Sequence, residues 1–160
     1  MIRQVERYHG AVLARLVRRH LSESISIRVH GSGRSGYVLD DRVGLYVKYS
    51  TNRLTPWLFS FSSEHQGEIA NLKSECTTFF IALVCGEDGI ACLNRFEYLR
   101  LLDDENPSVG WIRASRRSRE KYLLTGSDAK QELRVGDNEF PSKVSDALSM
   151  PDFEFREPHK

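Results

Sequence analysis

The sequence predicts an α/β (α+β) fold in which a helix precedes a mixed, mostly antiparallel sheet and a second helix packs on that sheet. Three observations support this prediction. Apolar residues recur at helical spacing near the N-terminus, they alternate with polar residues in several short segments, and they form an unbroken run at residues 79–85. A chain of 160 residues with 40% hydrophobic content is long enough to bury the core of one domain.

Residues 2–20 are predicted to be helical, although Gly10 weakens the pattern. One face of this helix is apolar and is formed by Ile2, Val5, Val12, Leu13, Leu16 and Val17, whereas Arg3, Arg7 and Arg18 share another face. In residues 25–30, the side chains of Ile25, Ile27 and Val29 point one way and the polar residues between them point the other way. This alternation predicts a half-buried strand.

Two further strands are expected at residues 37–40 and 44–50, joined by a tight acidic turn. The glycine-rich segment HGSGRSG, residues 30–36, reads as the flexible connection that precedes them. Trp57, Phe59 and Phe61 then alternate with smaller polar residues, which favours a strand whose aromatic side chains face the core.

A second helix is expected from Ser62 or Ser63 to about residue 77, because Glu64 and Glu68 suit the positive end of a helix. The run FFIALVC at residues 79–85 is typical of a central strand covered on both faces. The remaining expectations are a short return strand, a helix at 95–103 and a hairpin at 121–136. We expect one domain over residues 1–141, with a core at 2–93, a basic extension at 94–141 and a loose tail at 142–160.

The formal net charge is only +1, but the positive charges are clustered. One cluster is the first helix, with Arg3, Arg7 and Arg18. The other is the run WIRASRRSREK, in which Arg113, Arg116, Arg117 and Arg119 follow an aromatic residue. Clustered arginines beside an aromatic side chain indicate an anionic partner, and nucleic acid is the expected one. A solvated charged face, an acidic protein partner and a homodimer remain as alternatives.

The three cysteines are an odd number, and none of them forms a CxxC pair. Neither a disulfide framework nor a zinc site is indicated. No apolar stretch approaches the roughly 18 residues that a membrane span needs, and the N-terminus lacks the apolar core of a signal peptide. A cytoplasmic protein without a membrane partner is therefore expected.

The most informative pattern is the acidic turn, Asp40-Asp41, followed by Tyr46-Val47-Lys48 in the next strand. The order of helix, antiparallel strands, helix and buried strand, together with this partial motif, resembles the PD-(D/E)XK, or restriction-endonuclease-like, nucleases over residues 2–93. In that family, an acid at the hairpin and a second acid two residues before a lysine hold a divalent metal. The resemblance implies that Asp41, or Asp40, binds metal and that Lys48 assists the attacking water.

Tyr46 stands where the family has its second acid, and a neutral phenol is a poor ligand for a hard cation. Glu6 on the first helix, or Glu64 and Glu68 on the second, would then have to complete a site for Mg²⁺ or Mn²⁺. The resemblance implies a metal-dependent nuclease, or a nuclease-derived module, acting on DNA. The alternative is a non-catalytic module of the same fold that binds nucleic acid or a protein, in which the acidic residues are ordinary turn residues.

Overall fold

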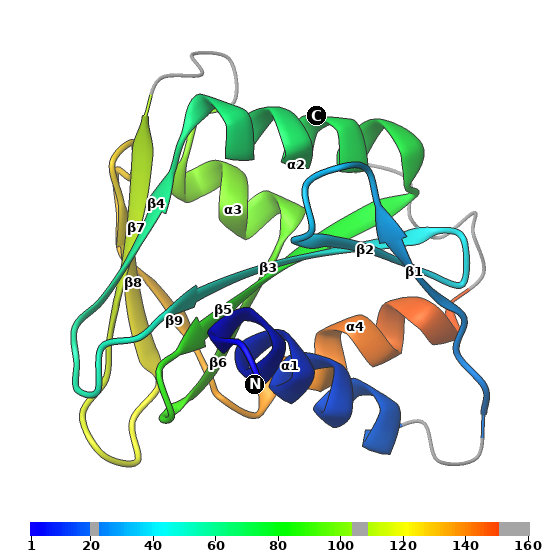
Figure 1. Cartoon of the computed structure of the whole chain (residues 1–160). Helices are drawn as coiled ribbons and strands as arrows, with labels where there is room; N and C mark the ends of the chain where they lie inside the picture. The colour runs from blue at the N-terminus through cyan, green and yellow to red at the C-terminus, as the bar shows by residue number, and fades with distance from the viewer. Residues whose placement is uncertain (20–22, 104–108, 151–160) are drawn as a thin grey trace.

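The computed structural model describes residues 1–19, 23–103 and 109–150, and within them the chain forms four helices and two sheets (Figure 1). Sheet A has the strand order β1-β2-β3-β5-β6. Its strands are β1 (Ile27–His30), β2 (Gly36–Leu39), β3 (Val43–Ser50), β5 (Thr78–Cys85) and β6 (Gly89–Asn94). Neighbouring strands in sheet A are antiparallel except β3 and β5, which run parallel. The predicted mixed, mostly antiparallel α/β fold is confirmed at this level.

A second sheet was not predicted. Sheet B is antiparallel and consists of β4 (Trp57–Phe61), β7 (Gly110–Ser115), β8 (Tyr122–Gly126) and β9 (Leu133–Val135). The chain leaves sheet A after β3, and β4 pairs with β7 instead of with a strand of sheet A. The hairpin expected at 121–136 is confirmed by the pairing of β8 with β9.

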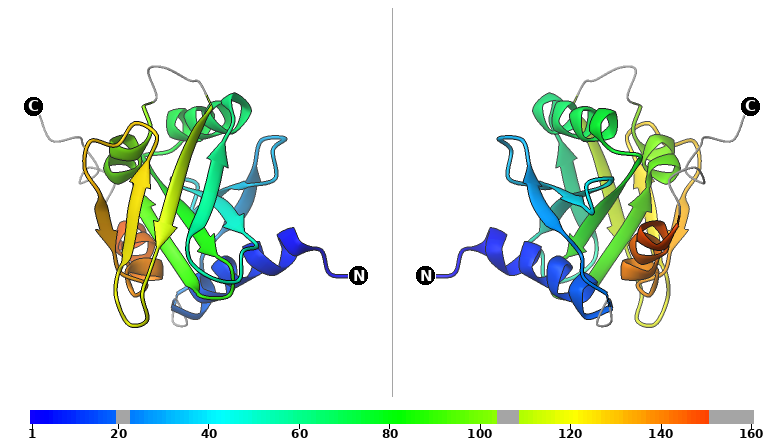
Figure 2. Two further views of the ribbon diagram at one scale, coloured as in Figure 1. Left: turned by 90° about the vertical axis from the view of Figure 1, so that its left-hand side faces the viewer. Right: turned by 90° about the vertical axis from the view of Figure 1, so that its right-hand side faces the viewer.

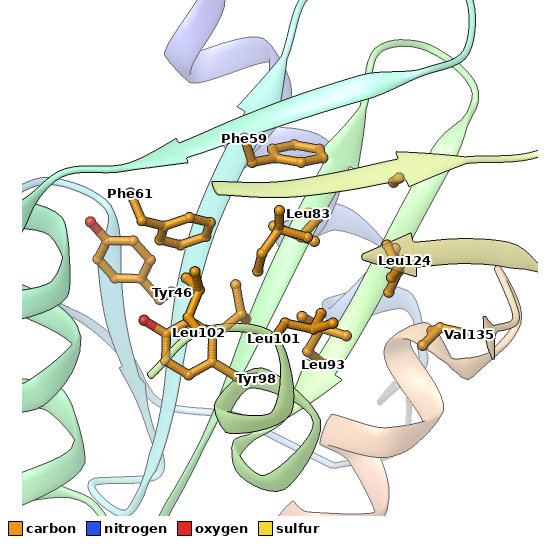
Figure 3. Packing of buried hydrophobic residues seen from close by; sticks show 14 of the residues in the cluster. Tyr46, Phe59, Phe61, Leu83, Leu93, Tyr98, Leu101, Leu102, Leu124 and Val135 are labelled. Atoms are coloured by element: carbon orange, nitrogen blue, oxygen red, sulfur yellow. The ribbon is translucent and has the colours of Figure 1, made fainter. Parts of the chain in front are cut away.

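The helices are α1 (Gln4–Arg19), α2 (Ser63–Glu75), α3 (Arg95–Leu101) and α4 (Glu139–Ser149). Figure 1 shows α1 and α4 on one face of sheet A and α2 and α3 on the other. The core is accordingly divided into two clusters. One lies between sheet A and the helices α1 and α4, and the other is enclosed by sheet A, sheet B, α2 and α3. Figure 3 shows part of this second cluster, where Phe59 and Phe61 of β4 lie over Leu83 and Tyr98.

The alternation of β3 determines which of its side chains can form a site. Leu45 and Val47 belong to the cluster under α1 and α4, whereas Tyr46 belongs to the cluster on the opposite face. Lys48 shares the Tyr46 face because residues two apart on a strand point the same way. On that face, α2 approaches β3 so closely that a Cβ at Gly44 would lie 2.7 Å from Cγ of Leu72.

The expectation of a loose tail from residue 142 is wrong up to residue 149, where α4 packs on sheet A. Apolar residues recur at helical spacing along α4, and Phe140, Val144, Ala147 and Leu148 are buried. Lys143 fixes the helix by donating to the carbonyl of Cys92 at 2.9 Å and to the carboxylate of Glu97 at 2.8 Å. Polar residues and a proline obscure this pattern in the sequence. Residues 151–160 of the expected tail lie outside the described residues.

Within the described ranges 1–19, 23–103 and 109–150, we find no helix that is both long enough and apolar enough to cross a membrane. Two of the three cysteines, Cys85 and Cys92, are buried, and all three are free thiols. Burial raises the pKa of both buried thiols, to about 12 for Cys92. They therefore act as small apolar core residues.

Candidate functional site

Asp40 and Asp41 form the turn between β2 and β3, and both adopt left-handed backbone conformations, with φ of 49° and 57°. The carboxylate of Asp40 accepts a hydrogen bond from the backbone N–H of Ser26 at 2.9 Å. The carboxylate of Asp41 pairs with the guanidinium of Arg28 at 3.3 Å on an exposed part of the surface. Short polar side chains tolerate this backbone conformation and bond to nearby groups, so both residues have local roles in the turn.

Lys48 lies toward the other end of β3, and the structure therefore separates it from the acidic turn. Five residue steps lead from Val43 at the start of the strand to Lys48, which at about 3.3 Å per residue amounts to roughly 16 Å. The expected juxtaposition of Asp40 and Asp41 with Lys48 is therefore wrong. The physical reason is the length of the strand, since a tight turn brings together only the residues beside it.

The other predicted metal ligands are also dispersed. Glu6 lies on α1, which packs on the face of sheet A opposite to α2, and Glu64 is exposed at the start of α2. Of the predicted acids, Glu68 is the one that lies near Lys48. No group of three or more His, Cys, Asp or Glu side chains able to hold a metal ion occurs in the part of the chain that the structure describes. The four carboxylates predicted as ligands thus do not fit one Mg²⁺ or Mn²⁺ site.

Lys48 instead belongs to a polar cluster formed by Tyr46, Lys48, His65 and Glu68. The hydroxyl of Tyr46 donates to the carboxylate of Glu68 at 2.7 Å, and Nζ of Lys48 donates to Nδ1 of His65 at 3.2 Å. The ammonium of Lys48 also lies 5.3 Å from the centre of the Phe61 ring. This cluster joins β3 to the first turns of α2.

The start of α2 explains the role of His65. The hydroxyl of Ser62 accepts from the backbone N–H of His65, and the backbone N–H of Ser62 donates to Nδ1 of His65 at 3.2 Å, which forms a reciprocal capping box. A backbone N–H can only donate, so Nδ1 is the acceptor and a neutral His65 carries its proton on Nε2. Nδ1 of His65 also accepts from Nζ of Lys48, and this contact joins the lysine to the helix cap.

Burial governs the electrostatics of the polar cluster. Burial lowers the pKa of Lys48, and the nearby carboxylate of Glu68 opposes this effect. Burial also raises the pKa of Tyr46, as does its hydrogen bond to Glu68, so the phenol stays a proton donor at neutral pH. Gly33 of the glycine-rich connection lies against Glu68, because a Cβ at this position would overlap the carboxylate. Glu68 thus accepts a hydrogen bond from Tyr46 and lies against the backbone at Gly33.

The basic run WIRASRRSREK divides between strand β7 and the loop that follows it. Trp111 and Arg113 point outward from β7, whereas Ile112 and Ala114 between them are buried. Arg116 pairs with Asp88 at 2.7 Å, and its guanidinium lies 4.4 Å from the centre of the Tyr122 ring. Arg116 therefore has a structural role, while Arg117 and Arg119 are exposed in the loop.

Trp111 and Arg113 lie on the outer face of sheet B, which has no described helix over it (Figure 2, left). The outward residues of this face are Leu58, Ser60, Trp111, Arg113, Leu123, Thr125 and Arg134. The strand register places Arg113 between Leu58 and Thr125, and Arg134 beside Leu123. Arg134 was not predicted as a site residue, although the alternation Leu133-Arg134-Val135 indicates an outward side chain.

A groove of about 520 Å³ opens at the loop end of this face. Its lining includes Arg116, Arg117, Lys121 and Arg134, and among its described lining residues Glu120 is the one acid. Asp88 neutralises Arg116, whereas Arg117, Lys121 and Arg134 form no salt bridge with any residue that the structure describes. Three cations without a salt bridge to a described residue thus lie beside Glu120, while the carboxylate of Glu139 interacts electrostatically with Lys121. We call this site the basic groove.

The arginines of α1 are exposed, but they do not form one patch. Arg7 pairs with Glu87 at 3.7 Å in the turn between β5 and β6, next to the Asp88 that holds Arg116. This turn thus connects the start of α1 with the β7–β8 loop. Arg3 precedes the helix, and Arg18 lies eleven residues after Arg7, roughly 16 Å away along the axis.

Comparisons with models of known protein families, with curated proteins and with solved structures found no match to this chain. A functional assignment therefore rests on the geometry of the two polar sites. The polar cluster around Lys48 has its acid and its lysine engaged within the protein, whereas the outer face of sheet B leaves arginines and an aromatic ring exposed to solvent.

Proposed function

We propose that the chain is a nucleic-acid-binding module that uses the outer face of sheet B and the basic groove. The observation that carries this proposal is the combination of exposed Trp111 and Arg113 with a groove beside them that is lined by Arg117, Lys121 and Arg134, none of which forms a salt bridge with a described residue. Arginine and lysine neutralise phosphates, and an exposed aromatic ring offers a stacking surface for a base. Arg113 and Arg117 from the predicted set contribute, together with Lys121 and Arg134.

The proposal includes descent from a restriction-endonuclease-like nuclease without metal-dependent cleavage at Lys48. The order of α1, the antiparallel strands, α2 and the buried strand β5 supports the ancestry. The separation of Asp41 and Glu6 from Lys48 supports the loss of a metal site at this position, and the side chain of Glu64 is exposed at the start of α2. The remaining acid, Glu68, accepts a hydrogen bond from the hydroxyl of Tyr46, the residue that stands where the nuclease family has its second acid.

Salt dependence tests the proposal with a number worked from the structure. If Arg113, Arg117, Lys121 and Arg134 each neutralise one phosphate, log K should fall against log[salt] with a slope of about −2.8 for a single strand, at about −0.7 per contact. Between about 50 and 200 mM salt, the affinity should drop roughly 50-fold. Fluorescence anisotropy with labelled 20-nucleotide strands and a 20-base-pair duplex measures this slope.

A charge-matched pair of variants makes the test specific. Arg113→Gln/Arg134→Gln should reduce the slope to about −1.4 because two phosphate contacts are lost. The control, Arg100→Gln/Lys130→Gln, removes the same charge from exposed positions on α3 and in the β8–β9 loop. The proposal fails if the protein binds none of the nucleic acids at low salt, or if both double variants bind equally. Cleavage that depends on added Mg²⁺ and on Lys48 would refute the loss of catalysis.

A further inference from the structure

The outer face of sheet B suits a single strand better than a duplex, because Trp111 lies on an internal strand of a wide sheet. The strand order is β4-β7-β8-β9, so β7 has a neighbour on each side. Three spacings of about 4.8 Å separate the outer strands by roughly 14 Å before side chains are added. The major groove of B-DNA is about 12 Å wide and admits a helix or a two-stranded ribbon. A duplex pressed on this face would meet it with phosphates alone.

A single strand avoids this restriction because its bases are free to turn toward the protein. Trp111 is 38% exposed and pairs with Ser60, whose small side chain covers little of a neighbouring ring. Arg113 follows two residues later on the same strand, about 7 Å further along β7. A base stacked on Trp111 thus places a neighbouring phosphate near a guanidinium.

The register also indicates a path from Trp111 to the basic groove. Leu123 on β8 pairs with Ser115 on β7 and with Arg134 on β9, so Arg134 lies two strands away from Ser115. Ser115 in turn lies four residues beyond Trp111 on β7. Four residue steps and two strand spacings give a diagonal of roughly 17 Å. This distance corresponds to about five stacked nucleotides at about 3.4 Å each.

We infer that the site takes single-stranded nucleic acid, with a base stacked on Trp111 and the phosphates leading past Arg113 into the basic groove. The inference rests on the proposed function and adds the class of nucleic acid and the orientation of the strand on the sheet. Both DNA and RNA present the required bases and phosphates, and the assay has one arm for each.

The test compares an oligo(dT) 20-mer, an oligo(rU) 20-mer and a 20-base-pair duplex at one salt concentration, using parent, Trp111→Ala and Trp111→Phe. Single strands should bind more tightly than the duplex. Trp111→Ala should weaken single-strand binding about 5- to 150-fold, which is the loss expected for one stacked base. Trp111→Phe retains a ring and should lose less, and neither change should alter duplex binding. A dT series should gain affinity steeply up to about five nucleotides.

Fluorescence provides a second readout, since the chain has two tryptophans and Trp57 is buried with its N–H donated to the carbonyl of Asn52. A bound single strand should quench Trp111, and the quenching should vanish in Trp111→Phe. Equal affinity for duplex and single strand, or unchanged binding by Trp111→Ala, overturns the single-strand inference but leaves nucleic-acid binding in place. Binding to none of the three nucleic acids overturns both.

Discussion

Replacing Tyr46 with phenylalanine tests the structural role of the polar cluster around Lys48. Tyr46 is 1% exposed, and its hydroxyl donates to the Glu68 carboxylate at 2.7 Å. A hydrogen bond to a charged group contributes about 1.5–3 kcal/mol, and the half-buried carboxylate recovers part of this from water. We therefore expect Tyr46→Phe to cost about 2 kcal/mol. For a chain of this size, that corresponds to a melting temperature lower by roughly 4–8 °C.

The assay is thermal and urea unfolding followed by circular dichroism, with Tyr49→Phe as the matched control. Tyr49 also lies on β3, where it is half-buried and its ring centre lies 4.8 Å from that of Tyr8, but its hydroxyl makes no hydrogen bond with the residues that the structure describes. Glu68→Gln keeps a neutral acceptor and should cost less than Tyr46→Phe. Equal losses for Tyr46→Phe and Tyr49→Phe would refute the assigned role of the hydroxyl.

Four further predictions concern the packing and stability of the helices and of β3. Burial lowers the pKa of His9, so below about pH 6.5 the unfolded chain binds a proton that the folded chain does not. The free energy of unfolding should therefore decrease as the pH is lowered through this range, and it should decrease less in His9→Gln. Urea unfolding at pH 7.5 and 5.5 measures this difference. Gly10→Ala should stabilise the fold by about 0.5–1 kcal/mol because alanine favours the interior of a helix more than glycine does. The added methyl causes no clash, since nothing lies within 4 Å of it. Gly44→Ala should lower the melting temperature because its Cβ meets α2. Val144→Ala should cost about 2 kcal/mol in urea unfolding, whereas a residue in a loose tail would cost nothing measurable.

Local patterns predicted the hairpins and the central strand well. The alternation around the Asp40-Asp41 turn matches the paired strands β2 and β3, and the unbroken apolar run matches β5, which is buried along its whole length. These features depend on residues close in sequence and on burial on both faces. The orientation of Trp57 and Phe59 toward the core is confirmed as well.

Assignment of strands to sheets could not be predicted in the same way. Alternation in residues 57–61 shows that one face is buried, but it does not reveal which strand is the neighbour. The partner of β4 is β7, about fifty residues later, and β7 was interpreted as a basic run instead of a strand. The error over Lys48 has a related cause, since a motif read along the sequence ignores how far an eight-residue strand extends.

The arginine run shows why charge must be counted by face. Neighbours in the sequence separate here: Arg113 points outward from β7, while Arg116 is held by Asp88 and Tyr122. Conversely, Arg134 lies far from the run in sequence but joins its surface through the register of β8 and β9. Counting the five positive charges of the run as one patch therefore overestimates the charge of that surface and leaves out Arg134, which belongs to it. Trp111 and Arg113 are informative because alternation with two buried residues fixes both on the same exposed face.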